Sequence, residues 1–481
     1  MWHYDPAHTH SSQLLPDVKR FLTELNASNF FSPDAPLYIA RAPGRLDLMG
    51  GIADYSGSLV LEYPLEVATL VAVQSSETPF VSIVSEGDRR NVSHVNIPLD
   101  VLCPGNGPLA YEDAHRLLTA NEEQAWAAYI AGVLVVLQRE CQLHMHQGVK
   151  IQVHCEVPIG KGVSSSAALE VATMHALCAL FDISLEGERM ASLCQKVENR
   201  IVGAACGIMD QMTSACGEEG SLLHLLCQPA HLSPSIRLPD DIEVWGIDSG
   251  VRHTVSGSDY TAVRVGAFMG YRIIAERAGL TVTHFAEGYV EIDDRHWSGY
   301  LANISPSEWE IHYRDFIPQE LSGEAFLEQY SGLTDSVTHV ESQRRYAVRQ
   351  PTAHPIYEHH RVQLFCELIQ MHPLTERHLT LLGELMYQSH ASYSACGLGS
   401  SGTDVLVERI KQAGPETGVY GAKITGGGCG GTVAVLARKD ARDIIERIVA
   451  QYEQETGRST TLLHGSSPGS AAWGILRLLP S

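Results

Sequence analysis

Positive charge is scarce in this sequence. Its 481 residues contain 34 lysines and arginines against 56 aspartates and glutamates, which gives a formal net charge of −22. A surface this acidic argues against nucleic acid or an anionic membrane surface as a partner. A phosphorylated small molecule would therefore have to be held by a few donors placed locally.

Long apolar runs are also missing. None approaches the roughly 20 residues that a helix needs to span a bilayer, and residues 129–137 are predicted to form a buried helix instead. Residues 1–6 lack a basic stretch followed by an apolar one, so no signal peptide is expected. These features predict a cytoplasmic protein with no membrane partner.

The eleven cysteines are scattered, and no two of them form a C-x-x-C pair. The chain therefore lacks the spacing of a disulfide framework or a zinc site, and reduced thiols are the simpler interpretation. The 23 histidines are equally dispersed. With 44% hydrophobic and 19% charged residues, the composition is that of a globular protein long enough for two or more domains.

Helical and strand patterns alternate along the chain. Residues 37–42 are predicted to form a strand that leads into a Pro-Gly turn, and residues 149–154 alternate like a second strand. Residues 123–142 and 186–202 have the periodicity of helices.

Prolines cluster at residues 229–239, which marks a change in composition. We place a domain boundary there and predict two domains, residues 1–235 and residues 236–481. Residues 285–355 are rich in aromatic and charged side chains and are interpreted as a lid or an insertion.

The most informative feature is a glycine- and serine-rich loop after the strand at 149–154. Residues 158–168 read Pro-Ile-Gly-Lys-Gly-Val-Ser-Ser-Ser-Ala-Ala and run into an apolar helical pattern. A glycine-rich turn that opens a helix presents backbone N–H groups to phosphate oxygens. The order matches neither a Walker A loop nor a Rossmann turn, and a small-residue turn that packs a helix against a strand is the alternative. The predicted nucleotide contacts in the loop are Gly160, Lys161, Gly162, Ser164, Ser165, Ser166 and Ala167.

Two further segments accompany this loop. Residues 41–55 read Arg-Ala-Pro-Gly-Arg-Leu-Asp-Leu-Met-Gly-Gly-Ile-Ala-Asp-Tyr, and residues 421–431 read Gly-Ala-Lys-Ile-Thr-Gly-Gly-Gly-Cys-Gly-Gly. The ordered set of three resembles the GHMP small-molecule kinases. The resemblance implies the α+β, two-domain GHMP kinase fold, with an N-terminal domain like domain 2 of ribosomal protein S5 and a C-terminal ferredoxin-like α/β sandwich. It also implies ATP as the phosphoryl donor and Mg²⁺ as a cofactor.

Residues 194–211 are similar to the corresponding stretch of galactokinases. That likeness implies that Glu198 and Ser166 bind magnesium and that Asp210 is the base facing the anomeric hydroxyl of a sugar. Arg45, from the first motif, would keep Asp210 ionised and stabilise charge on the transferred phosphoryl group. The residues alone leave two alternatives open, a solvated helix position for Glu198 and a helix N-cap for Asp210.

The glycine cluster at residues 425–431 has no side chains that would block the approach of another backbone. The resemblance implies that it lies beside the phosphate loop, and the strand-like runs at 419–424 and 432–436 favour a tight hairpin. Trp126 is predicted either to contact the nucleotide base or to be a core tryptophan.

The first motif departs from galactokinases where the sugar binds. Galactokinases read Gly-Glu-His-Thr-Asp-Tyr, and this chain reads Gly-Gly-Ile-Ala-Asp-Tyr. The retained Asp54 is implied to hold ring hydroxyls, whereas Gly51 and Ile52 offer no side-chain partner for a C6 hydroxymethyl group. Leaving that hydroxyl unpaired would cost about 1–3 kcal/mol, so the predicted substrate is an aldopentose with galactose-like hydroxyls. Gly207 and Tyr260 complete the predicted sugar contacts.

Residues 49–61, 209–217 and 346–358 resemble the kinase part of the L-arabinokinases. The predicted reaction is therefore phosphorylation of L-arabinose at C1 with ATP. A galactokinase, a uronic-acid 1-kinase and a non-catalytic sensor of sugar and ATP are the alternatives. Exchanging Gly51 and Ile52 for the galactokinase Glu and His is expected to shift the preference toward galactose.

Overall fold

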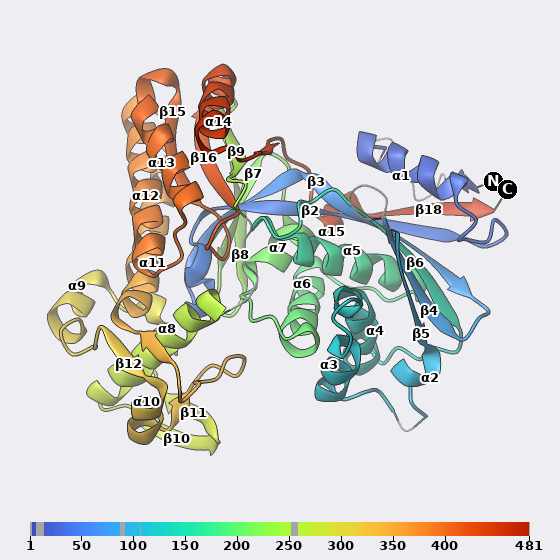
Figure 1. Ribbon diagram of the computed structural model, residues 1–481, viewed down its shortest axis with the longest axis horizontal. Coiled ribbons are helices and arrows are strands. Elements are labelled where there is room, and N and C mark those ends of the chain that lie inside the picture. The colour runs from blue at the N-terminus through green and yellow to red at the C-terminus, as the bar shows by residue number, and fades with distance from the viewer. Residues whose placement is uncertain (1, 6–13, 87–91, 106, 252–257, 481) are drawn as a thin grey trace.

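The computed structural model describes residues 2–5, 14–86, 92–105, 107–251 and 258–480. A nine-stranded sheet forms the first half, with the order β1-β18-β2-β3-β6-β4-β5, and β7 pairs with both β3 and β8 (Figure 1). Its strands are β1 (Trp2–Tyr4), β2 (Leu37–Met49), β3 (Leu59–Ser76), β4 (Phe80–Glu86), β5 (Val92–Pro98), β6 (Gly148–Cys155), β7 (Ser221–Leu226), β8 (His231–Arg237) and β18 (Ile475–Pro480).

Successive side chains of a strand point to opposite faces of the sheet. Strands β2 and β3 are buried on both faces because helices pack on each of them. Ile39 and Leu70 pack with α1 (Pro16–Ala27) on one face. Ala40 and Val71 pack with the helices of the opposite face. The other helices of this half are α2 (Leu99–Leu102), α3 (Tyr111–Thr119), α4 (Ala128–Glu140), α5 (Ser165–Leu180), α6 (Gly187–Lys196) and α7 (Met209–Cys216).

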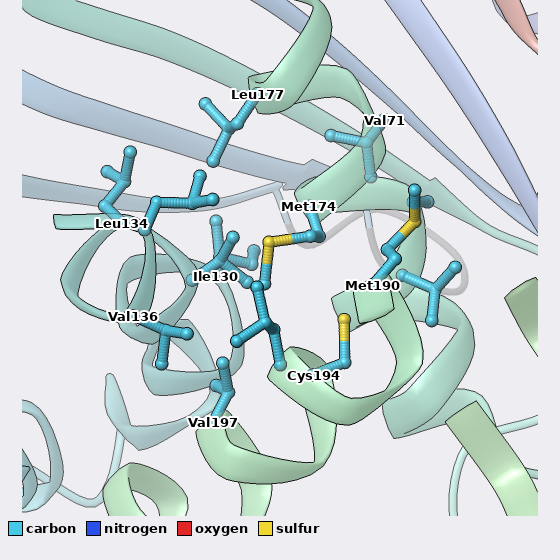
Figure 2. Packing of buried hydrophobic residues seen from close by; sticks show 14 of the residues in the cluster. Val71, Ile130, Leu134, Val136, Met174, Leu177, Met190, Cys194 and Val197 are labelled. Atoms are coloured by element: carbon cyan, nitrogen blue, oxygen red, sulfur yellow. The ribbon is translucent and has the colours of Figure 1, made fainter. Parts of the chain in front are cut away.

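The core between α4, α5 and α6 anchors the helix that follows the glycine-serine loop. Figure 2 shows Met174 and Leu177 of α5 among Ile130 and Leu134 of α4, with Cys194 of α6 close by. All five are fully buried. The start of α5 is therefore fixed by a rigid apolar core rather than by the loop itself.

Two predicted helices differ in detail. Residues 123–142 form a 3₁₀ turn, Ala125–Ala127, followed by α4, and residues 186–202 form α6 followed by a π-helical turn at Val197–Val202. A π-helical turn inside a helix is uncommon and is frequent at functional sites.

The second half is built on a four-stranded antiparallel sheet in the order β15-β16-β9-β17. The predicted hairpin of β15 and β16 is confirmed. The strands are β9 (Ile242–Asp248), β15 (Val419–Ile424), β16 (Thr432–Arg438) and β17 (Leu462–Leu463), and the helices are α11 (Arg349–Ile369), α12 (Glu376–Ala395), α13 (Ser401–Ala413) and α14 (Arg442–Thr456). The short helix α15 (Ser470–Trp473) packs on α7 and β2 of the first half.

The last strand, β18, leaves the second half and pairs with β2 of the first sheet, so the described ends of the chain lie next to each other (Figure 1). The first sheet otherwise ends with β8, and β9 opens the second. The division into residues 1–235 and 236–481 stays a prediction.

A separate lobe lies between α8 (Ser258–Arg277) and α11, at the lower left of Figure 1. We call residues 281–347 the side lobe. It has its own apolar core around Trp297, Trp309 and Phe326, which packs on α8. Its elements are β10 (Thr281–Ala286), β11 (Gly288–Asp293), α9 (Pro306–Glu308), β12 (Glu320–Ser322), α10 (Gly323–Tyr330), β13 (Gly332–Leu333) and β14 (Arg345–Ala347). The predicted lid or insertion at 285–355 falls on this lobe and the first turns of α11.

Candidate active site

Two adjoining cavities are lined by residues of both halves. The inner cavity has a volume of about 420 Å³ and the loop cavity a volume of about 490 Å³. The two share Arg45, Ala204, Asp210 and Gly427. All the predicted catalytic and sugar-binding residues line the inner cavity, namely Asp210, Arg45, Asp54, Gly51, Ile52, Gly207 and Tyr260. Most of the predicted nucleotide and metal contacts line the loop cavity, namely Gly160, Gly162, Ser164, Ser165, Ser166, Trp126 and Glu198.

The glycine-serine loop connects β6 to α5 and turns sharply before the helix. Gly160 and Gly162 have φ of +70° and +72°, and Ser164, at the N-cap of α5, has φ of +60°. Its hydroxyl is buried and has no hydrogen-bond partner among the described residues. The N–H groups of the first turn of α5 and this unpaired hydroxyl suit a phosphate oxygen.

The glycine cluster at 425–431 packs backbone against backbone on this loop. A Cβ on Gly426 would lie 2.6 Å from the carbonyl oxygen of Gly162, and one on Gly431 would lie 2.6 Å from that of Lys161. The Thr432 hydroxyl donates to the same Lys161 carbonyl at 2.8 Å. Glycines are required here because any side chain would separate the two segments.

Two predicted nucleotide contacts do not reach the loop cavity. The ammonium of Lys161 forms an ion pair with Asp248 of β9 at 2.7 Å, so its charge is already paired with a carboxylate of the second half. Ala167 is fully buried inside α5. The phosphate role of both residues stays a prediction. The geometry favours a structural role for the Lys161 side chain, whereas Ala167 lies in the first turn of α5 and would contribute only its backbone N–H.

Asp210 and Arg45 form the junction of the two cavities. The Arg45 Nε and Nη2 atoms donate to Oδ1 of Asp210 at 3.0 and 2.7 Å, and Nη1 donates to the carbonyl of Gly162 at 2.7 Å. Glu62 Oε2 lies 3.2 Å from Nε. Burial alone would lower the pKa of the Arg45 guanidinium, but the charges of Asp210, Glu62 and Asp47 outweigh it and raise the pKa. Arg45 is therefore a permanent buried cation.

Asp210 is not a helix N-cap. Ile208 occupies that position of α7, and Asp210 lies in the first helical turn with its carboxylate turned to Arg45. Among the described residues, no donor reaches its second oxygen, Oδ2. One oxygen of Asp210 is thus held by the guanidinium, and the other is available to a bound hydroxyl.

A second buried carboxylate lies at the far side of the same junction. Glu198, in the π-helical turn, accepts a hydrogen bond from Gln211 Nε2 at 2.6 Å, and Gln211 also reaches Glu170 of α5 at 3.4 Å. Burial, and then the charge of Asp210, raises the pKa of Glu198 to about 7, while a hydrogen bond with Ser166 opposes the shift. Glu198 is buried, so its solvated-helix alternative is wrong.

This donor set fits a magnesium ion. Carboxylates of Glu170, Glu198 and Asp210 gather near one another, and Arg45 is the cation that approaches Asp210. In the described part of the chain, no group of three or more acidic, histidine or cysteine side chains is arranged to hold a metal alone. Magnesium does not need one, since it usually takes one or two protein carboxylates together with phosphate oxygens.

The floor of the inner cavity carries Asp54, which lies in the 3₁₀ turn Gly51–Ser56 and is 4% exposed. Its Oδ1 accepts the backbone N–H of Tyr55 at 2.7 Å. Burial, followed by the charge of Asp210, raises the pKa of Asp54 to about 7. A Cβ on Gly207 would lie 1.6 Å from Asp54 Oδ2, so only glycine fits beside this carboxylate.

The space beside Gly51 is already filled by Tyr393 of α12. A Cβ on Gly51 would lie 1.4 Å from the Tyr393 hydroxyl, and Gly51 has φ of +26°. That hydroxyl accepts the backbone N–H of Ile52 at 2.9 Å and donates to Asp47 Oδ2 at 3.2 Å. The expectation that exchanging Gly51 and Ile52 for Glu and His shifts the preference toward galactose stays a prediction, and this geometry opposes it, because position 51 has no room for a side chain while Tyr393 is in place.

Sequence reasoning missed several residues of the site. Tyr129 lies one helical turn after Trp126 and lines the loop cavity with it. Their spacing of three residues, which places two side chains on the same face of a helix, could have indicated this. Gln211 lies in the stretch 194–211 that resembles galactokinases but was not singled out, and Tyr393 and Glu170 belong to no motif. Ile159, 78% exposed, lies at the mouth of the loop cavity.

The sequence matches three known family segments. Residues 128–218 match the GHMP kinases N terminal domain, residues 371–454 the GHMP kinases C terminal domain, and residues 27–75 the galactokinase galactose-binding signature. The chain is 40% identical to L-arabinokinase of Arabidopsis thaliana over 98% of its own length, and it spans about half (49%) of that longer protein. It is 29% identical to a galactokinase of Chloroflexus aggregans, over 88% of this chain and 90% of that one.

Solved structures agree with these matches at the level of the fold. Lactococcus lactis galactokinase complexed with galactose superimposes with a TM-score of 0.70 at 21% identity, over 94% of this chain and 99% of that chain. L. major mevalonate kinase in complex with R-mevalonate superimposes with a TM-score of 0.53 at 14% identity, over 90% and 97% of the two chains. The predicted α+β, two-domain GHMP kinase fold is confirmed.

No helix within the described ranges is long and apolar enough to cross a bilayer. Both GHMP kinase domains, the galactose-binding signature and the shared two-domain fold lead to one assignment: the chain belongs to the GHMP kinases, on their galactokinase-like branch.

Proposed function

We propose that this protein is an ATP-dependent sugar 1-kinase that converts L-arabinose and ATP to L-arabinose 1-phosphate and ADP, and that it works in the cytoplasm. The observation that carries the choice of sugar is the closed space beside Gly51, where the Tyr393 hydroxyl occupies the position of a side chain. The 40% identity to an L-arabinokinase supports the same choice.

The Asp210–Arg45 pair supports transfer to a hydroxyl. Asp210 lines the inner cavity, Arg45 holds its Oδ1, and its Oδ2 would be the acceptor for the hydroxyl proton. As the anomeric oxygen bonds to the γ-phosphorus, its proton passes to Asp210. The bond from the γ-phosphorus to the bridging oxygen breaks, and its electron pair leaves with ADP. Arg45 lies where it can also stabilise negative charge on the transferred group.

The loop cavity is the proposed ATP site. The N-terminus of α5 and the Ser164 hydroxyl would hold phosphate oxygens, and Trp126 with Tyr129 would border the nucleoside. Glu198 and Ser166 would hold magnesium. When bound, that ion neutralises charge on the phosphates and helps to orient them.

The inner cavity is the proposed sugar site. The ionised form of Asp54 is an acceptor for ring hydroxyls, and Tyr260 also lines the cavity. Ile52 is 1% exposed, and its backbone N–H is already used by Tyr393. A hydroxymethyl group placed there would lack a side-chain partner, at a cost of about 1–3 kcal/mol, or about 5- to 150-fold in affinity.

D-Galactose is the second candidate substrate, because residues 27–75 match the galactose-binding signature. The test is ADP release with ATP and Mg²⁺ against L-arabinose, D-galactose, D-galacturonic acid and D-glucuronic acid. We expect the highest kcat/KM with L-arabinose. A higher value for D-galactose or for a uronic acid would overturn the choice of sugar and leave the kinase assignment intact.

The same panel decides between an enzyme and a sensor. The Arg45–Asp210 pair and the serine loop are complete, which supports turnover. Binding of ATP and sugar without ADP release would overturn the kinase assignment. Omission of Mg²⁺ is expected to abolish turnover, and full activity in a chelator would contradict the proposed role of Glu198 and Ser166.

A further inference from the structure

The side lobe contributes one buried acidic residue to the neighbourhood of the inner cavity. Asp335 is 6% exposed and forms a two-point ion pair with Arg264 of α8, which is 5% exposed. Arg264 Nε donates to Oδ2 at 2.7 Å, and Nη2 donates to Oδ1 at 2.9 Å. The Thr338 hydroxyl and the Val337 N–H donate to the same carboxylate at 2.7 and 3.1 Å.

The remaining nitrogen of Arg264 reaches the wall of the inner cavity. Nη1 donates to the carbonyl of Cys206 at 3.1 Å. Cys206 belongs to the segment 203–207, which lines that cavity, and its N–H is in turn bound by the Asn199 side chain at 2.9 Å. The position of segment 203–207 therefore depends on a guanidinium that the side lobe orients.

Arg264 also contacts the floor of the cavity. Its guanidinium carbon lies 5.2 Å from the centre of the Tyr55 ring and 5.8 Å from that of Phe268. Tyr55 follows Asp54 directly and donates its backbone N–H to the Asp54 carboxylate. One side chain of α8 thus touches both the segment that contains Gly207 and the turn that contains Asp54.

We propose that the side lobe braces the sugar-binding cavity, with Asp335 as a positioning residue that acts through Arg264 on segment 203–207 and on the Asp54–Tyr55 turn. The identity of the ligand as a sugar rests on the proposed function. The brace itself rests on the ion pair and on the Cys206 and Tyr55 contacts, which are independent of the ligand.

The charge of Arg264 has a second effect on the same cavity. The charged groups that act on Asp54 are Asp210 of α7, Asp47 of β2 and Arg264 of α8. Burial and the two carboxylates raise the pKa of Asp54, and Arg264 opposes them. Loss of the guanidinium is therefore expected to raise that pKa further and to move the acid limb of sugar kcat/KM to higher pH.

The experiment compares Asp335→Ala, Asp335→Asn and Arg264→Lys in the full chain with a matched control, Tyr271→Phe. Tyr271 lies on the same helix, and its hydroxyl donates to Asp294 of the side lobe at 2.7 Å, but it has no contact with segment 203–207 among those described. The control removes a bond between α8 and the lobe without touching the brace.

We expect Asp335→Ala to raise the KM for the sugar by roughly tenfold or more, because a shift of about 1 Å in a positioning contact can cost as much as 100-fold. Asp335→Asn keeps an acceptor and should lie between Asp335→Ala and the unaltered protein. The KM for ATP should rise much less, within about twofold, since Ala204 is the one residue of segment 203–207 that also lines the loop cavity. Tyr271→Phe should change neither KM. An unchanged sugar KM in Asp335→Ala, or an equal rise for ATP, would overturn the brace.

Amide hydrogen exchange tests the brace without requiring that the protein turn over a substrate. Residues 203–207 should exchange faster in Asp335→Ala and in Arg264→Lys than in Tyr271→Phe. If the unaltered protein phosphorylates no sugar, the proposed function fails and the exchange data still decide on the brace. If Asp335→Ala does not fold, Arg264→Lys, which keeps the charge but loses the two-point geometry, carries the same comparison. Equal exchange at 203–207 in all variants would refute the proposal.

Discussion

A side chain at position 51 should be tolerated only when Tyr393 is removed. The Gly51 Cβ position lies 1.4 Å from the Tyr393 hydroxyl, and the ring cannot move aside easily. Tyr393 is fully buried, packs edge to face on His354 at 5.3 Å, and has the Lys423 ammonium 4.9 Å from its ring centre. Overpacking costs about 1–3 kcal/mol, and a side chain at positive φ costs about 1–2 kcal/mol more.

The measurement is the free energy of unfolding of Gly51→Ala, alone and in a Tyr393→Ser background. Alone, Gly51→Ala should cost about 2–5 kcal/mol. With Tyr393→Ser present, the backbone strain and the contact with Asp47 Oδ2, 2.6 Å from the Cβ position, should remain, so the two changes should couple by at least about 1 kcal/mol. Gly279→Ala is the matched control, because Gly279 has φ of +73° and open space around its Cβ position. Equal costs of Gly51→Ala in both backgrounds would refute the steric argument.

The same logic governs the choice of sugar. Gly51→Glu with Ile52→His should inactivate the protein toward L-arabinose and D-galactose alike, because the glutamate collides with Tyr393. Adding Tyr393→Ser should restore room and raise kcat/KM for D-galactose by about 5- to 150-fold over the double variant, the range expected for pairing one buried hydroxyl. A double variant that already prefers galactose would show that Tyr393 does not close this position.

Four further predictions test other parts of the site. Asp210→Asn should lower kcat by about 100- to 10,000-fold with little change in ATP affinity; near-normal turnover would contradict its role as the base. Because the pKa values of Asp54 and Glu198 are raised to about 7, kcat/KM for the sugar should fall as pH drops below about 7, and a flat profile to pH 5.5 would contradict these shifts. Both carboxyls bind their protons more tightly in the folded than in the unfolded protein, so without Mg²⁺ they stabilise the fold at low pH, and this stability is lost as pH rises through 7. Mg²⁺ should therefore raise Tm more at pH 8 than at pH 5.5. Lys161→Met should change the KM for ATP by less than about threefold because Asp248 holds the ammonium, and a larger rise would place that charge on a phosphate.

The chemistry of the site was predictable from sequence because it lies in contiguous motifs. The glycine- and serine-rich sequence indicated a sharp turn into a helix, and Gly160, Gly162 and Ser164 adopt positive φ at the turn into α5. Asp54 and Asp210 line one cavity although they lie on different elements, which only the resemblance to a known family had linked.

Local patterns misled the prediction where tertiary contacts decide the backbone. The strand predicted at 37–42 does not stop at Pro43 and Gly44; β2 continues to Met49 with a register shift beside Pro43. Gly44 is required because a Cβ there would lie 2.8 Å from the Val163 carbonyl of the phosphate loop. Its role is close approach of two backbones rather than a turn.

Contacts across great sequence separation could not be predicted at all. Ile52 and Tyr393 are 341 residues apart, and Arg264 and Asp335 are 71 apart. Neither Tyr393 nor Asp335 belongs to a motif, and each reads as an ordinary residue of its own segment. Only the folded chain shows that one closes position 51 and that the other orients a guanidinium at the cavity wall.

These contacts indicate that the two halves of the protein have different roles. The groups proposed to act on the reacting atoms, Arg45 and Asp210, come from the first half, where they lie on β2 and α7. The inner cavity is lined mostly by residues of the first half, but Tyr393 of α12 closes position 51, and Arg264 of α8, held by its partner in the side lobe, contacts the cavity wall. Substitutions in the second group should therefore change sugar KM and sugar preference while kcat for a well-bound sugar persists, whereas substitutions at Asp210 should do the reverse.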